Sequence, residues 1–134
     1  MNFDPVGVDE KGEYYMKYHM PFNTVEKIQL LQRSILVNSF AYYVMDSNIL
    51  SDFQYDANAM QLAEMRKKCP EEFERSRYYK YFHDYCQDDD VHYTSGFDLL
   101  ERVRKKDKEL YRHIRIDAIM ALDLKEKRGL QYDN

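Results

Sequence analysis

The sequence predicts an all-α fold, a single-domain helical bundle. Apolar residues recur at helical spacing after residue 23, capping boxes mark two helix starts, and no segment alternates apolar and polar residues as a strand does. The 134 residues suffice for one core and are too few for two ordinary domains. We therefore expect an N-terminal arm over 1–22 and one helical domain over 23–134.

Composition and charge exclude several classes of protein. The net charge of -4 argues against a protein that coats nucleic acid, because neutralising phosphates requires a basic face. Cys69 and Cys86 are too few for a disulfide scaffold. No apolar run has membrane-spanning length, and no secretion signal appears in the first ten residues. We expect a cytoplasmic protein that binds neither membranes nor nucleic acid directly.

The first two helices are predicted from their caps. Asn23 and Glu26 form a capping box before a helix expected from Thr24 to Asp46. Ser51 and Gln54 repeat the pattern, so a second helix follows a short loop over 47–50 and stops before Pro70. The arm over 1–22 has no periodicity and either packs through its aromatic residues or stays loose.

The later part of the chain predicts further helices. One should begin after Pro70 and end in the acidic run 88–90. Its apolar side would carry Phe73, Tyr78, Tyr81, Phe82 and Tyr85. The chain restarts at 94–96, and a last helix either runs through Asp107 or breaks there, with Gly129 at its C-cap.

A continuous last helix would align five basic residues on one face, where they could follow a phosphate backbone or meet an acidic partner. They are Arg102, Lys105, Lys108, Arg112 and Arg115. Asp107 and Glu109 interrupt this stripe, so we interpret it as a solvated face and assign no nucleic-acid binding to it.

Metal and catalytic sites are not predicted. His83, Cys86 and His92 lie near Asp84 and the acidic run 88–90, but their spacing follows no zinc pattern. Cys86 with His83 would be a thiol and base pair, yet no third orienting group can be assigned. We expect neither a metal ion nor catalytic residues.

The most informative residues lie at the corner between the first two helices. They are Tyr42, Tyr43, Asp46, Asp52, Tyr55 and Asp56. Asp52, Tyr55 and Asp56 are three and four residues apart and share one helix face. Aromatic faces attract a delocalised cation, and carboxylates accept hydrogen bonds from hydroxyl groups. The alternative interpretation is that the tyrosines are core residues and Asp52 only favours the helix dipole.

The two motifs of this corner, YxVxD over 42–46 and SDxxYD over 51–56, resemble the N-terminal (Ia) subdomain of bacterial NAD-dependent DNA ligases. The resemblance covers 23–74 and leaves 75–134 as additional helices. It implies a site for the nicotinamide mononucleotide half of NAD. Tyr42 and Tyr55 would sandwich the nicotinamide ring, Asp52 and Asp56 would contact ribose hydroxyls or the carboxamide, and Tyr43 would lie near the phosphate.

The chain departs from the ligases in lacking the KxDG motif, whose lysine forms the AMP adduct in that family. The sequence therefore predicts a non-catalytic module that binds nicotinamide mononucleotide or NAD. One alternative is a replication- or phage-related protein-interaction module with a decayed nucleotide site. Another is a split-ligase component that acts with a separate nucleotidyltransferase core.

Overall fold

The computed structural model describes residues 7–8, 14–15, 23–86 and 94–128, the first two ranges as backbone only. The described helices are α1 (Thr24–Val44), α2 (Asp52–Lys68), α3 (Pro70–Glu74), α4 (Tyr79–Phe82), α5 (Gly96–Lys106) and α6 (Lys108–Lys127). Two-residue strands β1 (Gly7–Val8) and β2 (Tyr14–Tyr15) pair antiparallel. The predicted all-α class is confirmed, with this short strand pair as a small addition. The side-chain packing predicted for the arm lies outside the described residues.

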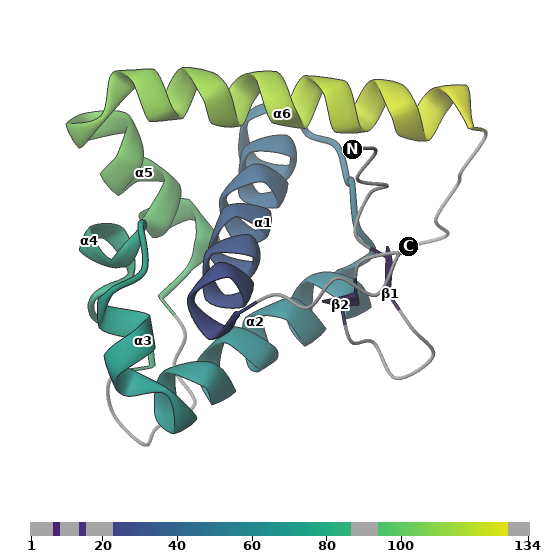
Figure 1. The fold of residues 1–134 in the computed structure, drawn as a ribbon. Coiled ribbons are helices and arrows are strands. Elements are labelled where there is room, and N and C mark those ends of the chain that lie inside the picture. The colour runs from purple at the N-terminus through teal and green to yellow at the C-terminus, as the bar shows by residue number, and fades with distance from the viewer. Residues whose placement is uncertain (1–6, 9–13, 16–22, 87–93, 129–134) are drawn as a thin grey trace.

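Helix α1 lies in the middle of the bundle (Figure 1). It packs against α2, α3, α5 and α6, and its inward face carries Ile28, Leu31 and Leu36, all without solvent exposure. The aromatic residues predicted for the apolar side of the helix after Pro70 belong to the same core. Burial of this apolar face is the main contribution to helix stability, because isolated helices of this length are marginal in water.

The starts of α1 and α2 agree with the predicted capping boxes. Asn23 accepts a hydrogen bond from the Glu26 N–H at 2.8 Å, and the hydroxyl of Ser51 accepts one from the Gln54 N–H at 3.2 Å. Helix α1 ends at Val44, slightly before the predicted Asp46. The reason lies in the backbone of Asp46, whose φ of 50° is left-handed and cannot continue a helix.

The prediction of a single helix after Pro70 is wrong, because α3 and α4 are separate short helices. Ser76 lies in the break and is buried. Its hydroxyl donates to the Phe73 carbonyl and accepts from the Gln32 side chain at 2.9 Å. The Arg77 N–H donates to the Gln29 side chain instead of to a helical carbonyl. These bonds satisfy the backbone outside a helix, so the chain turns. The predicted end of the helix in the run 88–90 lies outside the described residues.

The chain breaks at Asp107, which was one of the two predicted outcomes. Asp107 has φ of -146° and ψ of 85°, and its carboxylate caps α6 by accepting from the Leu110 N–H at 3.0 Å. The five basic residues therefore lie on two helices and not on one continuous face. Arg102 points to Asp84, and Arg112 pairs with Glu109. Gly129 lies outside the described residues, and the C-cap of α6 is Arg128.

Helix α5 is tied to the turn after α4 by an ion pair between Arg102 and Asp84. Two guanidinium nitrogens donate to the two Asp84 oxygens at 2.8 and 2.9 Å, and one also donates to the Tyr81 carbonyl. The hydrogen bonds from Arg102 lower the pKa of Asp84 from 3.8 to about 2, and Thr94 donates a further hydrogen bond to it.

Within the described helices, none is long and apolar enough to cross a bilayer.

We predict that Asp84→Asn lowers the free energy of unfolding at neutral pH by about 1 kcal/mol, since both partners are partly solvent-exposed and screened. The folded-state pKa is depressed, so this contribution is present above the unfolded-state value of 3.8 and lost as pH falls toward about 2. Urea unfolding of both proteins across this range should show the stability difference shrinking. A difference that stays constant down to about pH 2 would contradict the assignment.

Candidate functional site

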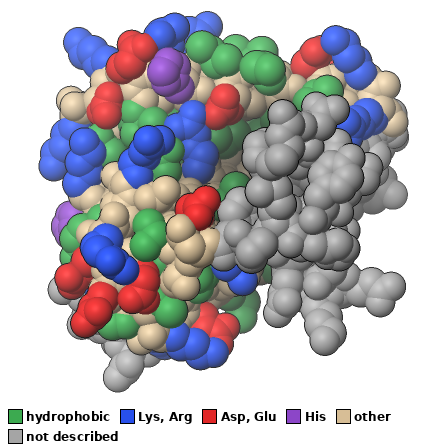
Figure 2. All heavy atoms as spheres, in the orientation of Figure 1, with side chains coloured by type: hydrophobic (Ala, Val, Ile, Leu, Met, Phe, Trp, Pro, Cys, Tyr) green, Lys and Arg blue, Asp and Glu red, His purple; other side chains and the backbone are tan. Residues whose placement is uncertain are grey.

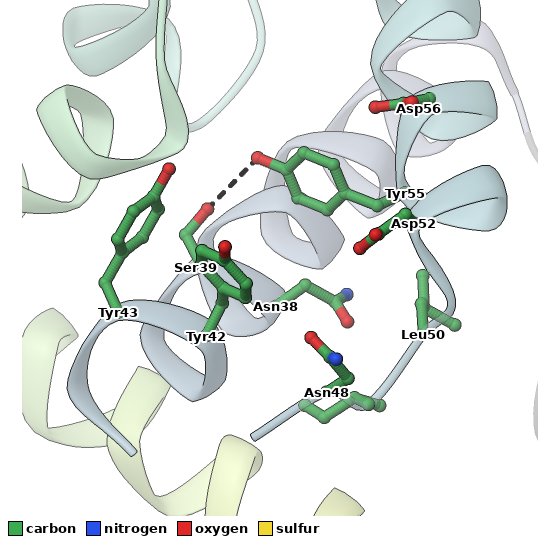
Figure 3. A pocket seen from close by; sticks show the side chains of 10 residues that line it. Asn38, Ser39, Tyr42, Tyr43, Asn48, Leu50, Asp52, Tyr55 and Asp56 are labelled. Carbon is green, nitrogen blue, oxygen red and sulfur yellow. Dashed lines mark hydrogen bonds between the residues drawn. The ribbon is translucent and has the colours of Figure 1, made fainter. Parts of the chain in front are cut away.

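A pocket of about 340 Å³ lies at the corner between the end of α1 and the start of α2. All five residues predicted for a nucleotide site line it: Tyr42, Tyr43, Asp52, Tyr55 and Asp56. The other described residues of the lining are Asn38, Ser39, Asn48, Ile49 and Leu50. Figure 3 shows Tyr42 and Tyr43 on the α1 side and Tyr55 and Asp52 on the α2 side. Asp46, the other acid of the corner, is exposed and does not line the pocket.

The turn between the helices creates this pocket. The Ser47 N–H donates to the Ala41 carbonyl at 2.9 Å, and the left-handed backbone at Asp46 reverses the chain. Ser51 then starts α2 with its side-chain cap. Because the loop is short, the last turn of α1 and the first turns of α2 are held next to each other.

The two tyrosines of α1 are accessible to solvent. Tyr42 is 54% exposed and Tyr43 is 48% exposed, and their rings meet edge-on with centroids 4.8 Å apart. Tyr43 also packs edge-on against Phe97 of α5 at 5.4 Å, which restricts its ring. The interpretation of both residues as core is therefore excluded, because about half of each side chain faces solvent.

Tyr55 forms a more rigid wall. It packs against the hydrophobic core, and its hydroxyl shares a hydrogen bond with the Ser39 hydroxyl at 3.2 Å. Burial raises the pKa of Tyr55, so the side chain stays a neutral phenol at physiological pH. One end of the residue is thus fixed by its backbone in α2 and the other by α1.

Gly96 of α5 closes the back of this wall. A Cβ at this position would lie 2.1 Å from the Ser39 hydroxyl oxygen and 2.5 Å from the Tyr55 hydroxyl oxygen. Glycine is required here by the close approach of the α5 backbone to both hydroxyls. Sequence reasoning treated Gly96 only as part of a chain restart, because nothing local in the sequence reports a contact with α1 and α2.

Two asparagines of the pocket were also missed. The Asn38 amide nitrogen donates to the Ser34 carbonyl at 2.7 Å, while its oxygen is buried without a partner among the described residues. The spacing of Asn38 and Tyr42, four residues apart in a helix, would have placed both on one face. The backbone carbonyl of Asn48, in the loop, accepts a hydrogen bond from Lys125 of α6.

Where the structure describes the lining, its charged side chains are the carboxylates of Asp52 and Asp56. Both are exposed at the start of α2. A negative, partly aromatic wall favours cationic or hydroxyl-rich ligands.

The alternative metal and thiol residues are not brought together where the structure describes them. Asp84 is committed to Arg102, and Cys86 is buried, which raises the pKa of its thiol and disfavours a reactive thiolate. Over 23–86 and 94–128, no group of three metal-ligating side chains converges. His92 and the run 88–90 lie outside the described residues.

Comparisons with known proteins identified no relative of this chain. No family model, curated protein or solved structure matches the chain. The resemblance to the ligase subdomain therefore stays a prediction that rests on the residues of the corner.

We predict that Gly96→Ala destabilises the protein by about 1–3 kcal/mol, because the new methyl group overlaps the Ser39 and Tyr55 hydroxyls. Urea unfolding of the variant measures the loss. Adding Ser39→Ala removes the nearer oxygen and should recover part of it, which a double-mutant cycle reports as coupling. Purely additive effects would show that overlap with the Ser39 hydroxyl does not cause the loss of stability.

Proposed function

We propose that the corner pocket binds the nicotinamide end of nicotinamide mononucleotide or NAD, and that the protein acts as a non-catalytic binding module. The observation that carries this proposal is the convergence of Tyr42, Tyr43, Asp52, Tyr55 and Asp56 on one pocket. These residues were chosen from their motifs in the sequence. Their meeting around a single cavity, with two tyrosines accessible from solvent, supports a ligand site over simple helix packing.

The chemistry of the pocket walls suits a pyridinium riboside. The tyrosine rings offer faces to a delocalised cation, and Asp52 and Asp56 offer acceptors for ribose hydroxyls. The volume of about 340 Å³ falls within the range of small-molecule pockets.

Binding without group transfer is the expected activity of this chain alone. The sequence contains no KxDG motif, and the described residues of the pocket lining include no lysine that could accept AMP. A role in adenylation would require a separate nucleotidyltransferase core. That alternative predicts that adding this protein restores AMP transfer from NAD to a ligase core lacking its own N-terminal subdomain, and failure to do so would remove it.

We predict that titration calorimetry detects binding of nicotinamide mononucleotide or NAD, and that Tyr42→Ala lowers the affinity about tenfold by removing an aromatic face. Phe53→Ala is the matched control. Phe53 is also aromatic and lies next to Asp52, but it is 82% exposed and does not line the pocket. The control should bind as the wild type does.

The proposal fails if millimolar concentrations of both ligands produce neither heat nor a thermal shift. It also fails if Tyr42→Ala, Tyr55→Ala and the control all bind with wild-type affinity. Tyr42 is the cleaner of the two test positions, since Tyr55 packs against the core and its loss also lowers stability.

A second candidate, an interaction module, is favoured by exposed apolar residues on α6. They are Ile116, Ile119, Met120 and Leu124. Figure 2 shows hydrophobic side chains gathered along this helix. Contiguous exposed apolar surface is typical of protein contacts. Capture of a partner that survives Asp52→Ala and Tyr55→Ala but is lost in Ile119→Lys would place the function on α6.

A further inference from the structure

The charge of the pocket distinguishes among nicotinamide ligands. Among the described residues of its lining, the charged side chains are two carboxylates, those of Asp52 and Asp56, and none is a lysine or arginine. The mononucleotide joins a cationic pyridinium to a phosphate that carries about -1.5 to -2 charges at neutral pH. The riboside has the same ring and sugar without the phosphate. The two ligands therefore differ in the group that this pocket is least suited to hold.

The start of α2 already carries a side-chain cap and a carboxylate. A free helix N-terminus attracts phosphate through its exposed N–H groups and its dipole. Here the hydroxyl of Ser51 accepts from the Gln54 N–H at 3.2 Å, and the Gln54 side chain accepts from the Ser51 N–H at 3.2 Å. Asp52 adds a carboxylate to the first turn. The helix end thus carries its own anion, which offsets the dipole that a phosphate would use.

A basic residue of α6, Lys125, contacts the pocket wall and is already hydrogen-bonded there. Lys125 of α6 donates to the backbone carbonyl of Asn48, on the loop side of the pocket. Its side chain is not among those that line the cavity. Turning it toward a phosphate would break that hydrogen bond, so the gain from a new ion pair would be reduced by the loss of the existing contact.

From this charge distribution we infer that the pocket selects a cationic pyridinium riboside over the same riboside carrying a 5′-phosphate. This inference rests on the proposed function and specifies its ligand class. The free riboside binds more tightly than the mononucleotide, because the two carboxylates attract the ring cation and repel the phosphate. The dihydro form of the riboside, which has a neutral ring, binds more weakly than the oxidised form for the same reason.

The test is a titration of the full chain with four compounds at low ionic strength: nicotinamide riboside, its dihydro form, nicotinamide mononucleotide and NAD. We expect the oxidised riboside to bind at least about tenfold more tightly than the mononucleotide, equivalent to about 1.4 kcal/mol. We expect the dihydro form to lose most of that affinity. Because these effects are electrostatic, raising the salt concentration should narrow both differences.

Charge-neutral variants make the test specific to the two carboxylates. Asp52→Asn and Asp56→Asn keep the side-chain shape and should weaken riboside binding while strengthening mononucleotide binding, so that the preference narrows or reverses. Glu71→Gln is the control, since it changes the charge equally on α3, beyond the far end of α2. The control should keep the wild-type preference. Thermal denaturation of each variant checks that it is folded.

The outcomes separate this inference from the function on which it rests. If the mononucleotide binds as tightly as the riboside or more tightly, the phosphate has a site and the inference is overturned, while the proposed function stands. If the oxidised and dihydro ribosides bind equally, the ring charge is not recognised and the inference is again overturned. If none of the four compounds binds, both the inference and the proposed function fail.

Discussion

The contact on which the pocket depends is the meeting of three helices at the hydroxyls of Ser39 and Tyr55 and the backbone of Gly96. It joins α1, α2 and α5 at the back of the cavity. The contact needs a glycine because the space left for a Cβ is already occupied by oxygen atoms. It also fixes the hydroxyl end of Tyr55, so that the wall formed by this ring is set by the bundle and not by the loop. The accessible tyrosines of α1 are then positioned opposite a rigid surface, which is the preorganisation that ligand binding favours.

Much of the fold could be predicted from local sequence signals. The capping residues Asn23 and Ser51 lie directly beside the segments that they start, so the beginnings of α1 and α2 required no knowledge of the rest of the chain. The division between α3 and α4 could not be predicted in this way. Its cause is a side-chain hydrogen bond between Ser76 and Gln32, which are 44 residues apart and meet only in the folded bundle. A serine at this position in an isolated sequence is compatible with both a helix and a turn.

The candidate site, too, could be predicted only where its residues belong to local sequence motifs. Its tyrosines and aspartates could be predicted because they belong to two neighbouring motifs separated by a short loop. Their union into a cavity follows from the left-handed turn at Asp46, which no spacing rule specified. Gly96 could not be found, because its role is a distance to side chains more than 40 positions away. Asn38 was detectable by its helical spacing from Tyr42, but polar residues on helices are common. It is distinguished by a buried side-chain oxygen that has no partner among the described residues.

The hydrogen bond from Lys125 to the carbonyl of Asn48 links segments that are 77 positions apart. Through it, the last turns of α6 hold the loop that separates the two motifs of the candidate site. Loop residues freed from such a link regain backbone entropy, which a ligand must remove again when it binds. The backbone order of the loop over 47–50 thus depends partly on α6, which follows much later in the chain. Shortening α6 would increase the backbone entropy that this loop loses when a ligand binds.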